Sequence, residues 1–191
     1  MLTHCTRLDL SGCSLEGPLP PQLSLMRAIK VLALSDNEFS GPLLARLVDC
    51  ARLEVLDLSH NKFDGELPRA WGRLKALKVL RLAKNRSLTG FMPDDWAELT
   101  NLEELDVSHN HLSGPVPATV LSLLQPSGEQ RRQSQRSSPS AKSSPSSPGA
   151  SSSSSGAAAK LKIVKLRGND WDPTIPRWPE VRWWVCCQCR C

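Results

Sequence analysis

One short pattern of leucines recurs along the chain at a nearly constant interval. Residues 56–68 read Leu-Asp-Leu-Ser-His-Asn-Lys-Phe-Asp-Gly-Glu-Leu-Pro, and residues equivalent to Leu56 stand 24 positions earlier at Leu32 and 24 positions later at Leu80. A fixed period of about 20–29 residues is the sequence sign of a solenoid, in which each repeat buries its apolar side chains only against its neighbours. The period therefore predicts a stacked-repeat fold.

Six segments fit the pattern L-x-x-L-x-L-x-x-N/C-x-L. The L-x-L step alternates with period two, so it predicts a short strand with both leucines buried and the residue between them on the opposite face. Parallel stacking of these strands predicts an α/β solenoid with a concave sheet and irregular or short-helical convex segments.

The asparagine column of the pattern predicts a structural ladder. An amide side chain both donates and accepts, so a buried asparagine satisfies backbone groups of adjacent repeats. In the first repeat a cysteine takes this place, and we expect its thiol to be buried. The column contains Cys13, Asn37, Asn61, Asn85, Asn110 and Asn169.

A second motif, G-x-Φ-P, follows the asparagine, as in Gly65-Glu66-Leu67-Pro68 and Gly114-Pro115-Val116-Pro117. This resembles the plant-type leucine-rich repeats of receptor-like kinases, receptor-like proteins and polygalacturonase inhibitors. The resemblance implies a second short strand in each repeat. The spacing Pro68-x-x-Trp71 is also similar to leucine-rich surface antigens of kinetoplastid parasites. Neither resemblance identifies a ligand.

The repeats are interrupted once. We assign residues 1–124 to repeats one to five, and 125–159 to a disordered Ser/Pro/Ala-rich insertion on the convex side of repeat five. Residues 160–178 form repeat six, and 179–191 form a Trp/Cys-rich tail or cap. Loop closure costs grow slowly with length, so repeat six is expected to stack on repeat five. The alternative is a loosely tethered 160–191 segment.

Charge and hydropathy restrict the partners and the compartment. Residues 1–124 contain 13 Lys/Arg and 15 Asp/Glu, too balanced a body for a nucleic-acid partner. No apolar run is long enough to span a bilayer, and residues 1–7 lack the apolar core of a secretory signal. Because the chain opens inside its first repeat, we expect a fragment of a longer protein or an incomplete gene model. A fragment implies the cell surface or a membrane, and a short protein implies the cytoplasm and self-association through its uncapped N-terminal end.

The concave face supplies the candidate contact residues. From Asp57 onward, the side chains between the paired leucines alternate in sign, which predicts an ionic ladder, a polar recognition stripe, or both. A second column, further along each repeat, contains two histidines and a lysine. The predicted partner-binding residues are Asp57, His60, Arg81, Lys84, Asp106 and His109.

No constellation predicts catalysis. His60 and His109 stand two repeats apart, about 10 Å by strand spacing, which is too far to share a metal. A nucleophile would need a base within hydrogen-bond reach, and alternation points Ser59 away from His60. We therefore expect no enzyme activity, cofactor or metal. A pH-sensitive binding face is the alternative use of the histidines.

Several residues match modification motifs. Asn85-Arg86-Ser87 is an N-glycosylation sequon on a ladder asparagine. The insertion either is an unmodified spacer, carries O-glycans, or is phosphorylated at Ser134, Ser138, Ser144 and Ser147. The terminal cysteines allow disulfides, palmitoylation with membrane association beside Trp183 and Trp184, free thiols, prenylation or metal binding. These cysteines are Cys186, Cys187, Cys189 and Cys191.

The sequence thus predicts a non-catalytic scaffold that binds a protein, peptide or glycan through its concave face. One alternative is the ligand-binding ectodomain fragment of a membrane receptor-like protein. Another is a surface antigen with little ligand specificity.

Overall fold

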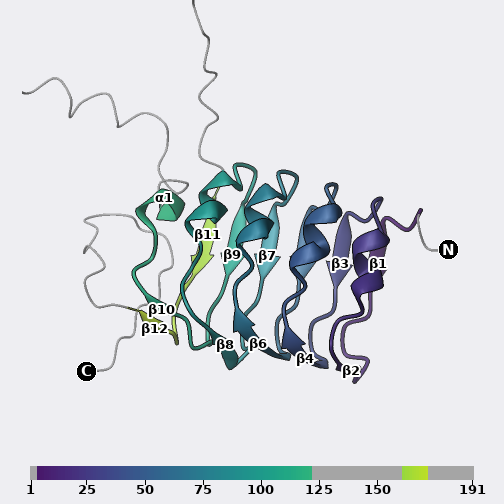
Figure 1. Ribbon diagram of the computed structural model, residues 1–191, viewed down its shortest axis with the longest axis horizontal. Helices are drawn as coiled ribbons and strands as arrows, with labels where there is room; N and C mark the ends of the chain where they lie inside the picture. Colours follow the sequence, from purple (N-terminus) through teal and green to yellow (C-terminus); the bar gives the residue numbers. More distant parts are fainter. Residues whose placement is uncertain (1–3, 122–160, 172–191) are drawn as a thin grey trace, which may run out of the picture.

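The computed structural model describes residues 4–121 and 161–171. Six strands pair in parallel and in chain order (Figure 1). They are β1 (Arg7–Asp9), β3 (Val31–Ala33), β5 (Val55–Asp57), β7 (Val79–Arg81), β9 (Glu104–Asp106) and β11 (Ile163–Lys165). Leu56 stands opposite Leu32 on one side and Leu80 on the other, so the L-x-L step sets the register.

The G-x-Φ-P motif forms part of a second set of parallel strands, as the resemblance implied. One sheet contains β2 (Glu16–Gly17), β4 (Glu38–Pro42), β6 (Lys62–Glu66) and β8 (Ser87–Thr89). β10 (Ser113–Gly114) pairs with β12 (Asp170–Trp171). The glycines of this motif have positive φ, for example 75° at Gly65, a conformation that side chains other than glycine disfavour.

Short helical turns form the convex side. Four are 3₁₀ helices, namely η1 (Pro21–Leu25), η2 (Ala45–Asp49), η3 (Arg69–Arg73) and η4 (Asp94–Glu98), and α1 (Ala118–Leu121) is a single α-helical turn (Figure 1). Buried Trp71 and Trp96 stack with ring centroids 6.4 Å apart. Gly72 permits η3 and η4 to approach closely, because a Cβ built there would lie 2.1 Å from the backbone oxygen of Asp95.

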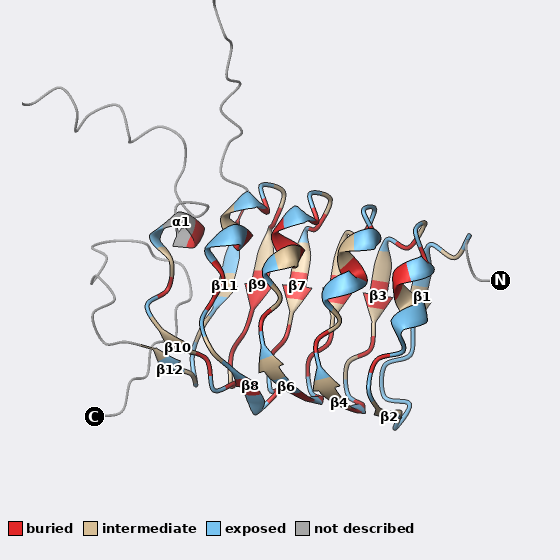
Figure 2. Ribbon diagram, in the orientation of Figure 1, coloured by how far each residue is buried: buried red, intermediate tan, exposed pale blue. Residues whose placement is uncertain are grey.

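The leucine columns form one continuous core (Figure 2). Leu58 of repeat three is 0% exposed, whereas its equivalent in repeat one, Leu10, is 36% exposed. The difference arises because a repeat in the middle of the stack is covered on both sides, whereas β1 is paired on one side only.

Repeat six stacks directly on repeat five, as the sequence predicted. β11 pairs with β9, with Val164 opposite Leu105, and the Lys162 ammonium lies 2.7 Å from the Glu103 carboxylate. The chain leaves the described body after α1, which packs against η4, and re-enters it at Leu161. The insertion 125–159 and the tail 179–191 lie outside the described residues, and their assigned boundaries stay predictions.

Candidate interaction surface

The asparagine ladder joins successive repeats through backbone hydrogen bonds. Asn61 Oδ1 accepts from the Phe39 N–H at 3.1 Å, and its Nδ2 lies 2.9 Å from the Leu34 oxygen of the preceding repeat. The Leu58 and Ser59 oxygens of its own repeat lie 3.2 and 3.1 Å from the same Nδ2. Asn37, Asn85, Asn110 and Asn169 make equivalent bonds.

Cys13 departs from the predicted ladder. Its backbone N–H donates to Asn37 Oδ1 at 3.0 Å, but its thiol is exposed instead of buried. A ladder side chain is buried by the repeats on both of its sides, and among the described residues repeat one is covered only by repeat two. The expectation of a buried thiol at Cys13 was therefore wrong.

The glycosylation sequon coincides with a fully buried ladder residue. Asn85 is 0% exposed, and its Nδ2 lies within 3.0 Å of the Leu58 and Leu82 oxygens. This nitrogen is the atom that would carry a glycan. The fold therefore leaves the sequon sterically closed.

Three of the six predicted contact residues spend their charges on one another and on neighbouring strands. Arg81 lies 3.4 Å from Asp57 and 2.8 Å from Glu104, and Lys165 lies 3.0 Å from Asp106. The predicted ladder ran from Arg81 to Asp106, but Arg81 uses Glu104 as its partner on β9. The guanidinium fork binds both Glu104 oxygens, a bidentate geometry that favours this pair.

The two aspartates are held further by serines two residues ahead. Asp106 accepts from the Ser108 hydroxyl at 2.6 Å and from its N–H at 3.1 Å, and Asp57 has the same arrangement with Ser59. The Asp106 side chain is only 9% exposed. Burial acts to raise the pKa of Asp106, but the Ser108 and Lys165 hydrogen bonds outweigh it, so that its pKa lies below the ordinary value. Both oxygens are thus occupied, which leaves this carboxylate little capacity to bind a partner.

A second charged row was missed by the sequence reading. It runs along the residues that immediately precede the concave strands: Lys30, Glu54, Lys78, Glu103 and Lys162. Glu54 bridges Lys30 at 3.3 Å and Lys78 at 2.6 Å. Hydrogen bonds from Lys78 and Lys30 hold the pKa of Glu54 below its ordinary value. The alternation of sign at the repeat spacing was the signal that could have revealed this row.

An apolar row lies along the strands between these two charged rows. Val31, Val55 and Val79 are register partners, and each is partly exposed. Ala33 lies two residues beyond Val31 and so shares the same face of the sheet. The row ends at Glu104, the partner of Arg81. The concave face of repeats two to four therefore presents a narrow apolar strip flanked by charges.

The other three predicted contact residues occupy the turn after the strands. His60, Lys84 and His109 all have positive φ, between 54° and 59°. The equivalent residues at both ends of the column are Gly12 and Gly168, which is a sequence signal for this left-handed conformation.

These three side chains face different neighbours. His60 Nδ1 lies 3.3 Å from the Asp36 carboxylate, and the His109 ring covers Gly168, where a Cβ would lie 2.7 Å from Nδ1. Lys84 is exposed and forms no ion pair with any residue that the structure describes. The predicted site is thus divided into a paired group on the sheet and a more open group on the turn.

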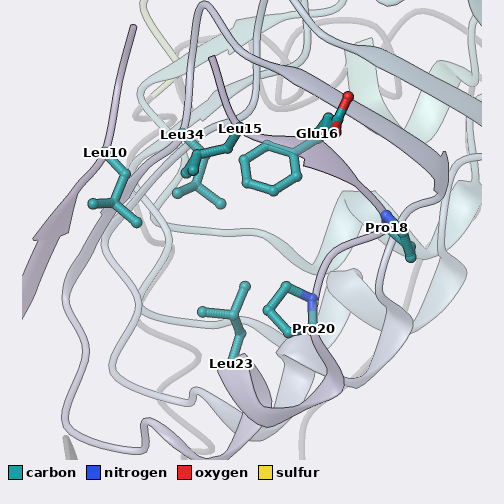
Figure 3. Close-up of a pocket in the computed structure, with 8 residues that line it drawn as sticks. Leu10, Leu15, Glu16, Pro18, Pro20, Leu23 and Leu34 are labelled. Carbon is teal, nitrogen blue, oxygen red and sulfur yellow. The ribbon is translucent and has the colours of Figure 1, made fainter. Parts of the chain in front are cut away.

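A cavity of about 370 Å³ opens at the first repeat. Figure 3 shows its leucine and proline lining, with Glu16 as the one charged residue among the labelled side chains. Its lining consists of Leu10, Leu15, Glu16, Pro18, Pro20, Leu23, Leu34 and Phe39. Self-association through this end stays a prediction.

Within residues 4–121 and 161–171, the His, Cys, Asp and Glu side chains form no group able to hold a metal ion. Over the same ranges, no helix is long and apolar enough to cross a bilayer. The predicted phosphorylation serines and the four terminal cysteines lie outside the described residues.

A parallel concave sheet, an asparagine ladder and a second parallel sheet define a class of repeat solenoid. Two family models described as leucine-rich repeat match residues 51–112 and 4–26. The chain is a leucine-rich repeat protein, and its solenoid is similar to those of plant receptor-kinase ectodomains. A comparison with curated proteins found no match.

Three solved Arabidopsis thaliana structures illustrate the similarity. The GASSHO1/SCHENGEN3 ectodomain, solved with CASPARIAN STRIP INTEGRITY FACTOR 2, is 38% identical over 56% of this chain, with a TM-score of 0.54. A chain of the BIR3–SERK2 complex is 34% identical over 60%, with a TM-score of 0.58. The HAESA ectodomain, solved with an extended IDA peptide hormone, is 25% identical over 86%, with a TM-score of 0.65.

The matched proteins are longer than this chain. The chain covers 13% of the GASSHO1/SCHENGEN3 chain, 22% of the HAESA chain and 61% of the BIR3–SERK2 chain. These structures include complexes with peptide hormones and with another protein, so the fold serves as a protein-interaction scaffold in them.

Proposed function

We propose that this solenoid is a non-catalytic interaction scaffold that binds an extended segment of a protein partner across β3, β5 and β7. The observation that carries the proposal is the partly exposed row of Val31, Val55 and Val79 between two ion-paired rows. An extended segment crossing the strands would place apolar side chains on the valines and polar groups over the flanking charges. Solenoids commonly bind partners on such extended concave surfaces.

The six predicted contact residues take different roles in this proposal. Asp57, Arg81 and Asp106 shape and stiffen the surface, because their charges are already paired. Lys84, with no ion pair in the described part of the chain, is available to an anionic group of the partner. His60 and His109 border the same turn. The comparisons support a protein or peptide partner, and a glycan partner stays the alternative.

A displayed library of short linear peptides provides a direct test. Peptides selected on the wild-type chain should bind the Val55→Thr/Val79→Thr double variant about tenfold more weakly, because both substitutions remove apolar contact while keeping the β-branched shape. The matched control is Leu25→Thr, which alters an exposed apolar side chain on the convex side. Unchanged affinity for the double valine variant, with weaker binding to the control, would place the site elsewhere.

Arg81 and Lys84 separate recognition from support. Lys84→Ala should weaken binding without changing the unfolding midpoint, since the lysine makes no ion pair with a described residue. Arg81→Ala should lower the midpoint as well, because it leaves Asp57 and Glu104 without their shared cation. Equal effects of both variants on stability would contradict this division.

The same scaffold could form part of a membrane receptor, as the receptor-kinase neighbours suggest. A full-length transcript that encodes a membrane span after the repeats would favour this reading. A transcript that encodes the repeats alone would favour a free scaffold.

A further inference from the structure

The convex turns divide sharply by charge. Segments 20–29, 44–53 and 68–77, which contain η1, η2 and η3, carry six basic residues and one acidic residue. Segment 93–102, which contains η4, carries three acidic residues and no basic residue. The basic residues are Arg27, Arg46, Arg52, Arg69, Arg73 and Lys75. Much of these turns is exposed, as the pale blue colour in Figure 2 shows.

Part of this charge is neutralised where the two groups meet. Lys75 lies 2.6 Å from the Glu98 carboxylate, and Arg73 is close enough to Glu98 to act on its charge. The other four arginines are exposed and form no ion pair with any described residue: Arg27, Arg46, Arg52 and Arg69. We call these four residues the convex arginine patch.

The patch is unusual for this chain. Six of the seven described lysines are in ion pairs, all except Lys84. The unpaired cations of the convex turns are instead arginines, whose planar guanidinium groups bind phosphate in a bidentate manner. Because η1 packs on η2 and η2 on η3, the patch forms one surface across three repeats.

An apolar side chain accompanies the charges. Leu25 is 62% exposed on η1, at the end of the patch farthest from the acidic η4 turn. An extended polyanion in solution has no use for an exposed leucine, whereas the boundary of a bilayer accepts one. The spread of the arginines over three repeats also suits a broad anionic surface better than one phosphate ion.

We propose that η1, η2 and η3 dock on an anionic lipid bilayer, with the convex arginine patch over headgroup phosphates and Leu25 in the interfacial region. Basic residues gain binding energy near an anionic leaflet, and the acidic η4 turn is held away from it. The opposite, concave face stays open to a protein partner. The inference does not depend on the proposed function, because the two surfaces share no residue.

Vesicle co-sedimentation of the full chain tests this proposal. The wild-type chain should bind vesicles of phosphatidylcholine and phosphatidylserine, and should not bind phosphatidylcholine alone. Each arginine removed should weaken binding about fivefold, so Arg46→Gln/Arg69→Gln should weaken it about twentyfold. The loss should shrink as salt is added, since salt screens exposed charges. Leu25→Ser should weaken binding to the same vesicles in a salt-independent way.

The matched control removes the same charge from elsewhere. Arg86 and Arg167 are exposed arginines outside the convex turns, so Arg86→Gln/Arg167→Gln should weaken vesicle binding by about twofold at most. Thermal unfolding of both double variants checks that they are folded.

Three outcomes would overturn the proposal. Equal losses in the two double variants would mean a response to net charge and not to the patch. Unchanged binding of Arg46→Gln/Arg69→Gln would place the membrane contact in another part of the chain. Patch-dependent retention on heparin without vesicle binding would assign the surface to a linear polyanion.

Discussion

Replacing the central ladder asparagine, Asn61, should destabilise the solenoid by an amount that its hydrogen bonds define. The side chain is buried and has one acceptor bond, from Phe39, and three carbonyl oxygens near its nitrogen. The amide has only two hydrogens, so at most three full hydrogen bonds exist at a time. At about 1 kcal/mol net for each bond, Asn61→Ala should lower the free energy of unfolding by about 3 kcal/mol.

Asn61→Asp has the same shape and should cost more. The new carboxylate keeps the bond from Phe39 but points its second oxygen at carbonyl oxygens, which disfavours the ionised form and raises the carboxyl pKa in the folded state. Stability linked to a raised carboxyl pKa is present below the unfolded pKa, about 4, and is lost as the pH rises through the folded pKa. The deficit of Asn61→Asp should therefore grow from acidic to neutral pH, whereas that of Asn61→Ala should not.

Urea unfolding followed by circular dichroism measures both effects, with Asn101→Ala as the control. Asn101 lies on the convex side and is partly exposed, and its printed bond to the Lys75 oxygen is classed with exposed contacts. The control should cost no more than about 1 kcal/mol. If Asn61→Ala and Asn101→Ala shift the midpoint equally, the ladder does not stabilise the stack as reasoned here.

Three further predictions concern close packing, acid stability and modification. Gly72→Ala should lower the free energy of unfolding by about 1–3 kcal/mol in urea titrations, because its Cβ would meet the Asp95 backbone; a wild-type midpoint would contradict the close approach. The pKa of Asp106 is lowered, so the stability it contributes is present above the unfolded pKa and is lost as the pH falls through the folded pKa. Asp106→Asn should flatten this acid-dependent fall in unfolding midpoints, and an unaltered pH profile would refute the assignment. Asn85 should carry no glycan after secretion from a eukaryotic host, and a peptide N-glycosidase that reduces the mass of the wild-type chain but not of Asn85→Gln would show otherwise.

Much of the architecture could be predicted because its determinants repeat. The spacing of Leu32, Leu56 and Leu80 sets both the strands and their register, since each leucine must meet its equivalents to be buried. The same reasoning located repeat six beyond the insertion, and β11 pairs with β9. The left-handed turn was also recorded in the sequence, by the glycines at both ends of the His60 column, but this signal was not used.

The ion-pair network could be predicted only in outline. Alternating signs indicated that Arg81 would be paired, but Glu104 and Asp106 are both within the same strand. The choice depends on the reach and fork geometry of the guanidinium group, and Arg81 takes Glu104 while Asp106 takes Lys165. As a consequence, charges that marked a binding stripe in the sequence are largely used inside the sheet.

The sequence by itself determined the solenoid, its register and its buried asparagines, because burial and backbone hydrogen bonding repeat with the chain. Only the tertiary structure decided which surface residues are free. It showed that Asp57 is already paired, that Cys13 is exposed, and that the valine row and the convex arginine patch are open to solvent. The physical reason is that exposure and pairing depend on neighbours contributed by other repeats, at distances that side-chain conformations set and residue types alone do not.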